Sequence, residues 1–297
     1  MSESSKKVGF IGTGVMGLPM ARNLIKGGFD VTAFDLNSDA LKTIRQDGGA
    51  VADSATEAAR GAKTVITMLP NGDHVMEAVF GEKGVIHAMA EGSALIDMST
   101  ILPTVTDEIA ARLEAKGRRL VDAPVGRTSQ HAIDGKLLIM AGGAEDDVEA
   151  ARPMLSKMGD TIIYCGPSGS GTRMKLINNY MSIASNVVAA EALTLAERSG
   201  VDRDLAIKVM MGTTAGQGHL STTYPAKVLK GDVNPGFMID LAHKDMGLAL
   251  DFASHLKVPL PMGAAARQGY TSAQVQGRGR DDWTAMLETV RKLAGLD

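Results

Sequence analysis

The feature that most constrains this chain is a set of three glycines placed between an expected strand and an expected helix. Lys7–Gly12 (KVGFIG) is a short apolar run typical of a buried strand, and Val15–Gly28 has the pattern of a helix that ends at a glycine pair. Gly12, Gly14 and Gly17 form a GxGxxG across this junction. In such a context the first glycine permits a tight turn, the second lets backbone approach a pyrophosphate, and the third lets helix and strand pack. Since the helix N-terminus also favours negative charge, the sequence predicts a dinucleotide-binding βαβ unit.

An acidic residue at the end of the next expected strand indicates which dinucleotide is bound. Asp35 ends Val31–Asp35 and comes 21 residues after Gly14, close to the spacing of about 20 typical of this fingerprint. Its carboxylate can accept hydrogen bonds from both ribose hydroxyls of NAD, and it repels a 2′-phosphate. The next three residues include no arginine: they are Leu36, Asn37 and Ser38. The pattern favours NAD (NADH) over NADP.

Four more residues are expected beside the cofactor. Val15 and Met16 lie inside the glycine loop, and Leu69 and Thr100 lie in loops at the ends of two later strands. Ligands bind at the carboxyl ends of strands in open α/β sheets. Ordinary turn and helix-cap chemistry is the alternative explanation for these two loops.

The order of expected elements predicts two domains of different class. A chain of 297 residues is long enough for two domains of roughly 100–150 residues, and its 44% hydrophobic and 22% charged residues are typical of a globular protein. Up to residue 165, short β-rich runs alternate with helical stretches, as in a doubly wound, mainly parallel α/β sheet whose last strands can be antiparallel additions. The expected strands are Lys7–Gly12, Val31–Asp35, Thr64–Leu69, Ala94–Asp97, Arg119–Asp122, Leu137–Ala141 and Thr161–Tyr164.

Beyond a glycine-rich junction at Gly166–Gly171 the pattern is helical only. The expected helices are about Arg173–Ser199, Leu205–Met211, Met238–Leu256, Gly263–Gln276 and Trp283–Leu293. The predicted domains are therefore residues 1–165, an α/β cofactor domain, and residues 166–297, an all-α domain.

Composition excludes several classes of protein. With 31 Lys and Arg against 34 Asp and Glu, the net charge of −3 does not favour a nucleic-acid-binding protein. The single cysteine, Cys165, cannot form an internal disulfide, which favours a reducing compartment. No apolar run approaches the roughly 20 residues of a membrane span, and the N-terminus does not resemble a signal peptide. The six histidines show no metal-ligand spacing. We expect a cytoplasmic protein with no membrane, nucleic-acid or metal partner.

Four segments, taken in order, resemble signatures of the β-hydroxyacid dehydrogenase family, and the resemblance runs from Val8 nearly to the C-terminus. The segments are GFIGTGVMG, DAPVGRTSQHAIDG (residues 122–135), GPSGSGTRMKLINN (166–179) and HKDMGLALD (243–251). The resemblance implies an N-terminal Rossmann domain, an all-helical domain that serves substrate binding and assembly, and an active site between them. It also implies a homodimer or homotetramer.

Lys175 is the candidate acid/base of the reaction. It follows the glycine junction, and Asn178 and Asn179 lie three and four residues later, on a shared helical face. The resemblance implies that Lys175 is the catalytic acid/base, that Asn179 orients substrate and lysine, and that Lys244 contacts the cofactor near the nicotinamide. A solvated surface lysine is the alternative for Lys175, and a surface ion pair with Asp245 is the alternative for Lys244.

The segment after Ala-Pro-Val departs from most of the family, which carries a serine and two glycines there. This chain has Gly126, Arg127, Thr128 and Ser129. A guanidinium fork and two hydroxyls suit a tetrahedral anion with three oxygens better than a flat carboxylate. Together with MLPNGD, KLINNYMSIA and FMIDLAHKD, this GRTS segment closely resembles the sulfolactaldehyde reductase branch of the family. We therefore expect Arg127 to hold a sulfonate, helped by Thr128, Ser129 and Asn178. The alternative is a structural salt bridge at Arg127 and an ordinary carboxylate substrate.

Three functions remain in competition. The leading one is NADH-dependent reduction of 3-sulfolactaldehyde to 2,3-dihydroxypropane-1-sulfonate, with Lys175 as proton donor and Arg127 on the sulfonate. The second is a reductase or dehydrogenase of a carboxylate substrate, such as 3-hydroxyisobutyrate, tartronate semialdehyde or succinate semialdehyde/4-hydroxybutyrate. The third is a non-catalytic dinucleotide sensor, which would need neither Lys175 nor Asn179.

Overall fold

The computed structural model describes residues 6–296. Internal contacts divide the chain into two compact units, of which the first ends at Tyr180 and the second begins at Met181. Helix α8 (Ser170–Arg198) runs from one unit into the other. Each unit is described separately below.

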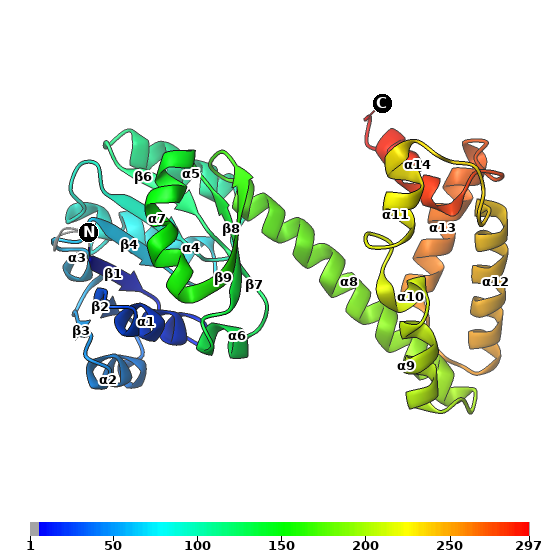
Figure 1. The fold of residues 1–297 in the computed structure, drawn as a ribbon, viewed down its shortest axis with the longest axis horizontal. Helices are drawn as coiled ribbons and strands as arrows, with labels where there is room; N and C mark the ends of the chain where they lie inside the picture. Colours follow the sequence, from blue (N-terminus) through cyan, green and yellow to red (C-terminus); the bar gives the residue numbers. More distant parts are fainter. Residues whose placement is uncertain (1–5, 297) are drawn as a thin grey trace. The chain divides into compact units, whose positions relative to one another are not determined.

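The first unit contains a nine-stranded sheet that confirms the doubly wound α/β class (Figure 1). Strands pair in the order β3-β2-β1-β4-β5-β6-β8-β7, and β9 pairs with β8. The first six of these are parallel, β8 is antiparallel to β6 and β7, and β9 is parallel to β8. The strands are β1 (Lys7–Ile11), β2 (Asp30–Phe34), β3 (Ala50–Val51), β4 (Thr64–Thr67), β5 (Ala94–Asp97), β6 (Arg119–Asp122), β7 (Val125–Gly126), β8 (Leu137–Gly142) and β9 (Gly159–Gly166). The expected antiparallel additions are present, whereas β3 and β7 were not expected because two residues carry no periodicity.

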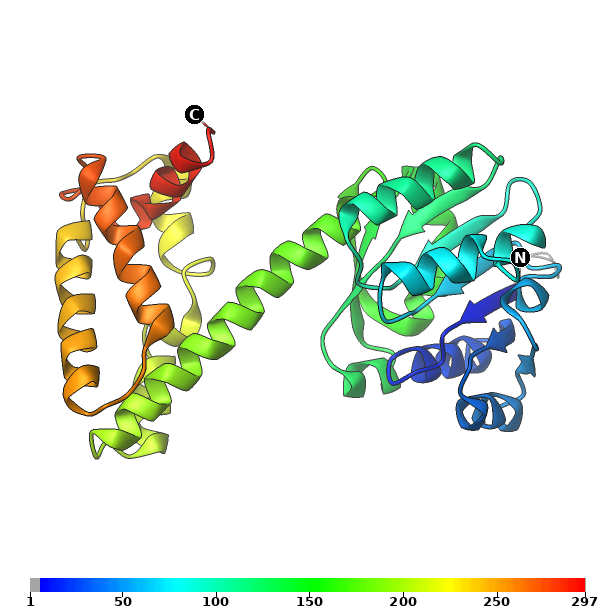
Figure 2. The same ribbon diagram turned by 180° about the vertical axis from the view of Figure 1, so that it is seen from behind.

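Helices cover both faces of this sheet because alternate strand residues point to opposite sides. Phe10 and Ile66 pack into the core on one face, and Ile11 and Val65 pack into the core on the other. The first face is covered by α1 (Gly17–Lys26), α2 (Ser38–Gln46), α6 (Ser129–Ile133) and α7 (Glu145–Met158). The second, seen from the front in Figure 2, is covered by α3 (Ala55–Ala58), α4 (Gly72–Phe80), the 3₁₀ turn η2 (Val85–His87) and α5 (Pro103–Glu114).

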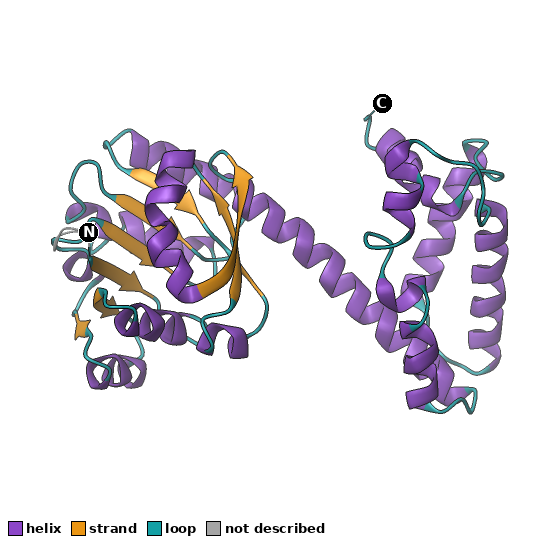
Figure 3. Ribbon diagram, viewed as in Figure 1, coloured by secondary structure: helices purple, strands orange, loops and turns teal. Residues whose placement is uncertain are grey.

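The second unit is helical, as expected. Figure 3 shows every strand before α8 and only helices and loops after it, within the residues that the structure describes. The elements are α9 (Arg203–Met211), α10 (Thr214–Gln217), α11 (Thr223–Ala226), η3 (Val228–Lys230), α12 (Ile239–His255), α13 (Pro261–Val275), η4 (Trp283–Ala285) and α14 (Met286–Leu293). Between residues 6 and 296, no helix combines the length and the apolar character needed to cross a membrane.

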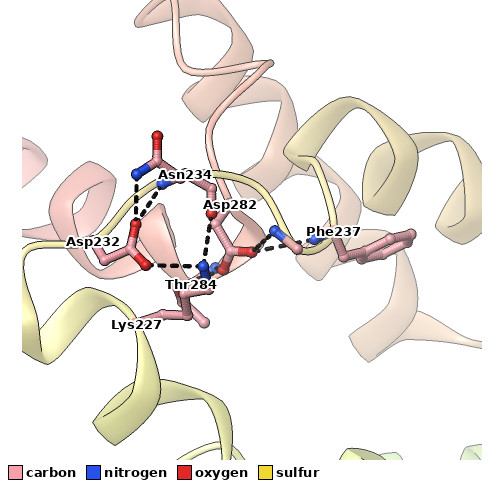
Figure 4. Close-up of polar contacts among 7 residues, drawn as sticks. Lys227, Asp232, Asn234, Phe237, Asp282 and Thr284 are labelled. Atoms are coloured by element: carbon pink, nitrogen blue, oxygen red, sulfur yellow. Dashed lines mark hydrogen bonds and ion pairs between the residues drawn. The ribbon is translucent and has the colours of Figure 1, made fainter.

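A buried carboxylate holds the chain just before α12 (Figure 4). Asp282 accepts hydrogen bonds from the N–H groups of Gly236 and Phe237, and from the N–H and hydroxyl of Thr284. Burial raises the pKa of Asp282, but these hydrogen bonds outweigh it and bring the pKa below its ordinary value. Asp282 also caps the 3₁₀ turn with which the expected helix Trp283–Leu293 begins.

Candidate active site

The three glycines of the nucleotide loop are each required for a different reason. Gly12 has φ 96°, and a Cβ there would collide with the carbonyl oxygen of Met68. A Cβ on Gly17 would collide with the carbonyl oxygen of Gly12, so this glycine allows α1 to pack against β1. A Cβ on Gly14 would meet nothing within 4 Å, so this glycine leaves its side of the backbone open to a ligand. The loop therefore has the turn, the packing and the open approach that a dinucleotide needs.

A cavity of 630 Å³ opens beside this loop at the carboxyl ends of β1, β2 and β4. Val15, Met16, Asp35 and Leu69, four of the residues expected beside the cofactor, line it. No side chain caps the start of α1, and the N-terminus of a helix favours an anion such as a pyrophosphate. Thr100 is exposed and does not line this cavity.

Four polar residues of the cavity were not predicted: Ser54, His74, Glu77 and Lys83. They come from the elements that follow β3 and β4, and nothing in their local sequence marks them. The one local signal is Asn71, whose side chain caps α4 at the N–H of His74 (3.0 Å). Their place depends on how these elements pack against the sheet.

The Asp35 carboxylate is held at the edge of the cavity by backbone donors. Its Oδ1 accepts from the N–H of Asn37 at 2.7 Å, and its Oδ2 accepts from the N–H of Thr13 in the glycine loop. Leu36 beside it is 91% exposed. The negative charge is thus fixed where a ribose would lie, with no cation among the three residues that follow.

Two buried carboxyls that the sequence analysis did not assign lie side by side at the ends of β5 and β6. Asp97 pairs in register with Asp122, and burial raises the pKa of both carboxyls. Asp122 accepts from the N–H groups of Gly169 and Thr172, both at 2.7 Å, and so anchors the first turn of α8. The available signal was an acidic residue that ends an apolar strand, a position where a charge is costly unless it is hydrogen-bonded.

Lys175 lies one turn beyond this anchored start of α8. It is partly buried, and desolvation lowers the pKa of its ammonium. Asn179 is also partly buried, and Asn178 is exposed. Both asparagines lie one turn after Lys175 on α8. A partly buried lysine with a lowered pKa gives up its proton more readily than an exposed one, which suits proton transfer.

Arg127 has a backbone conformation that glycine normally adopts. Its φ is 75°, which costs an L-residue about 1–2 kcal/mol. The guanidinium Nη1 lies 2.6 Å from Asp160 Oδ1 and also donates to the carbonyl of Lys136, and Nη2 donates to Thr161 Oγ1 at 3.2 Å. The salt bridge considered as an alternative is therefore present, although the side chain remains 32% exposed.

The remaining residues of the GRTS segment continue from Arg127. Thr128 Oγ1 lies 2.9 Å from Nδ1 of His131, and Ser129 begins α6. Gly126 pairs with Leu138 of β8, and Leu138 lines a 570 Å³ cavity together with Asn178 of α8. The GRTS segment and the Lys175 helix thus approach the same part of the sheet.

Lys244 lies on α12 in the second unit. Its Nζ is 2.7 Å from Asp245 Oδ1, and its side chain is 58% exposed. This is the ion pair that was weighed against a cofactor contact. Among the described residues there is also no group of three or more His, Cys, Asp or Glu side chains that could hold a metal ion.

Comparisons with known proteins agree with this geometry. Residues 7–166 match the family described as the NAD binding domain of 6-phosphogluconate dehydrogenase. Residues 169–290 match the family described as NAD-binding of NADP-dependent 3-hydroxyisobutyrate dehydrogenase. The chain therefore belongs to the β-hydroxyacid dehydrogenase family: it is an oxidoreductase that acts on CH–OH groups with an NAD-type cofactor.

Two relatives and one solved structure show which members of this family the chain is similar to. The chain is 51% identical to 3-sulfolactaldehyde reductase from Escherichia coli (strain K12), over 97% of each chain. It is 37% identical to the mitochondrial 3-hydroxyisobutyrate dehydrogenase of Mus musculus, over 97% of this chain and 88% of the relative. The structure of Mycobacterium tuberculosis 3-hydroxyisobutyrate dehydrogenase with L-serine aligns with a TM-score of 0.68 at 34% identity, over 97% of this chain and 99% of the other.

Proposed function

We propose that the chain reduces 3-sulfolactaldehyde to 2,3-dihydroxypropane-1-sulfonate with NADH. The observation that carries the proposal is Arg127, a fixed cation in a glycine-like conformation within the segment that meets the substrate in this family. A strained residue persists where the rest of the structure or the function requires it. The 51% identity to a 3-sulfolactaldehyde reductase supports the same substrate.

Each residue of the proposed site has a separate role in the reaction. NADH supplies the hydride to the aldehyde carbon. Lys175 donates the proton to the carbonyl oxygen and stabilises the negative charge that develops there, and Asn179 orients it. Arg127 grips the sulfonate with help from three neutral donors, Thr128, Ser129 and Asn178. Lys244 serves the nicotinamide side of the site.

The preference for NADH over NADPH is also part of this proposal. Asp35 is supported by two backbone N–H groups, so its carboxylate cannot swing away from a bound ribose without losing both. A 2′-phosphate at that place would meet this charge, with no arginine among residues 36–38 to offset it.

A carboxylate substrate is the second candidate, and a specific observation favours it. Arg127 is paired with Asp160, so its charge is already balanced within the protein. The 37% identity to a 3-hydroxyisobutyrate dehydrogenase points to the same alternative. In that case the backbone and hydroxyls of the segment would hold a flat carboxylate.

Oxidation of NADH with a matched set of aldehydes tests the proposal. The set is 3-sulfolactaldehyde, tartronate semialdehyde, succinate semialdehyde and methylmalonate semialdehyde, the aldehyde of 3-hydroxyisobutyrate. We expect kcat/KM to be highest for the sulfonate by at least about tenfold, because a three-oxygen anion uses the guanidinium and the hydroxyls together. A higher kcat/KM for any carboxylate would overturn the proposal. No turnover of any aldehyde would favour a dinucleotide sensor.

A further inference from the structure

The guanidinium of Arg127 is engaged along one edge. Nη1 donates to Asp160 Oδ1 and to the carbonyl of Lys136, and Nη2 donates to Thr161 Oγ1. The Thr161 hydroxyl in turn donates to Asp160 Oδ1 at 2.8 Å, which closes a ring of three side chains. These contacts occupy the edge formed by the two terminal nitrogens.

The opposite edge of the guanidinium keeps its donors. A guanidinium has five N–H groups, and the contacts above use both on Nη1 and one on Nη2. Within residues 6–296, the Nε–H and the second N–H of Nη2 make no hydrogen bond. These two neighbouring donors form the side edge of the fork, which matches two oxygens of one anion.

A β-bulge places Asp160 where it can reach Arg127. Leu137 of β8 pairs with Gly159, but the next residue, Leu138, pairs with Thr161, so Asp160 has no partner on β8. Bulges bend a strand and redirect a side chain, and they occur often beside active sites. The bulge on β9 and the positive φ of Arg127 are independent irregularities, and they meet in one ion pair.

We propose that Asp160, with Thr161, is a positioning residue for the substrate anion: it holds Arg127 so that the Nε–Nη2 edge presents two donors to the sulfonate. This inference rests on the function proposed above. Arginine loses much side-chain freedom when it binds an anion. A side chain already held in one orientation loses less of that freedom when the substrate arrives.

The alternative to positioning is competition, in which Asp160 and the substrate anion bind the same guanidinium of Arg127. Two substitutions of Asp160, by asparagine and by alanine, separate the two effects. Asp160→Asn keeps an oxygen acceptor for Nη1 but removes the negative charge, whereas Asp160→Ala removes both. If the contact orients Arg127, Asp160→Asn stays close to wild type and Asp160→Ala does not. If the contact competes, both variants bind the sulfonate more tightly than wild type.

The test is steady-state kinetics on 3-sulfolactaldehyde and on lactaldehyde, the same aldehyde without the sulfonate. We expect Asp160→Ala to raise KM for the sulfonate about threefold to tenfold, with kcat changed less than about twofold. Asp160→Asn should stay within about twofold of wild-type KM, and neither variant should change KM for lactaldehyde. Asp134→Ala is the matched control, because Asp134 is an exposed carboxylate of the same segment that pairs with Gln130 and not with Arg127.

A double variant separates this inference from the proposed function. In an Arg127→Ala background, Asp160→Ala should add no further rise in KM, because no guanidinium is left to orient. An unchanged KM in Asp160→Ala, or a lower KM in both single variants, would overturn the positioning role and leave the sulfonate assignment standing. If Arg127→Ala itself leaves KM for the sulfonate unchanged, the sulfonate assignment fails and the positioning role fails with it. Asp160 is 48% exposed, so the thermal unfolding midpoint should stay near wild type and exclude misfolding as the cause.

Discussion

Two loops of the same sheet each contain a position with positive φ, but they place different kinds of residue there. The loop after β1 needs a positive φ at Gly12, and a glycine is there. The segment after β7 has a positive φ at Arg127, where a glycine would cost less. The first loop follows every local rule of a dinucleotide fingerprint. The second breaks a general backbone rule, because it places a residue with a side chain at a φ that favours glycine.

The difference indicates which part of the site is general and which is particular to this chain. The nucleotide loop has open space at Gly14 and leads into an uncapped start of α1, and the fixed carboxylate of Asp35 lies beside it. All three suit a cofactor shared by many enzymes. At Arg127 the chain retains about 1–2 kcal/mol of backbone strain to keep a guanidinium. Departures from local preference of this kind are expected at functional sites.

The largest effect should come from Lys175 on α8. Lys175→Ala removes the proton donor, so kcat should fall by about 10²–10⁴. The Kd for NADH, measured by fluorescence titration, should stay near wild type, because the nucleotide loop is untouched. Lys208→Ala, which removes an exposed lysine of α9, is the matched control. A kcat near wild type in Lys175→Ala would remove this lysine from the mechanism.

The second prediction concerns Asp35, which follows β2 at the edge of the nucleotide cavity. Asp35→Ala removes the acceptor for the ribose hydroxyls and the repulsion of a 2′-phosphate. Hydrogen bonds to a charged group contribute about 1.5–3 kcal/mol, so kcat/KM for NADH should fall roughly 10- to 100-fold. The value for NADPH should stay the same or rise. Steady-state kinetics with both cofactors provide the measurement, and a wild-type preference for NADPH would contradict the assignment of Asp35.

The pH dependence of the two reaction directions should follow Lys175. Desolvation lowers the pKa of this ammonium, and aldehyde reduction needs the protonated form as the acid. The kcat/KM for reduction should therefore be high below that lowered pKa and fall above it. Alcohol oxidation needs the neutral amine and should show the opposite trend. If the falling limb of reduction persists in Lys175→Ala, another group controls it.

The smallest expected effect measures the strain itself. Arg127→Gly and Arg127→Ala both remove the ion pair with Asp160, but only glycine relaxes at φ 75°. Arg127→Gly should be more stable than Arg127→Ala by roughly 1 kcal/mol in urea unfolding. Equal stability of the two variants would mean that the backbone of the segment relaxes freely, and the contrast between the loops would lose its energetic basis.

Most of the fold was predictable because its signals are local. Apolar runs, helical periodicity and the glycine junction predicted seven of the nine strands and the change to an all-α second unit. The short strands β3 and β7 and the 3₁₀ start before α14 were missed, since they depend on pairing partners and on the Asp282 cap. The strand–glycine–helix junction could be predicted for the same reason: its signal lies within a few positions of the chain.

The remainder of the site depends on contacts between distant segments. Asp122 meets Gly169 and Thr172 across about 50 positions, and Arg127 meets Asp160 across 33. The bulge that directs Asp160 comes from the register of β8 with β9, which no single segment specifies. The sequence therefore singled out the residues to which we assign the chemistry, but not the residues that hold them in place.

The proposed function depends most on Arg127 holding a sulfonate, and one comparison of variants tests this directly. The measurement is kcat/KM of wild type, Arg127→Ala and Arg127→Lys for 3-sulfolactaldehyde and for lactaldehyde. Arg127→Ala should lose at least about tenfold on the sulfonate, because a charge-assisted hydrogen bond contributes about 1.5–3 kcal/mol and 1.36 kcal/mol is a factor of ten. It should lose far less on lactaldehyde, and Arg127→Lys should recover only part of the loss, because an ammonium restores the charge without the planar fork. Equal losses on the two aldehydes would contradict the account, since Arg127 would then support the segment through its salt bridge with Asp160 rather than hold the sulfonate.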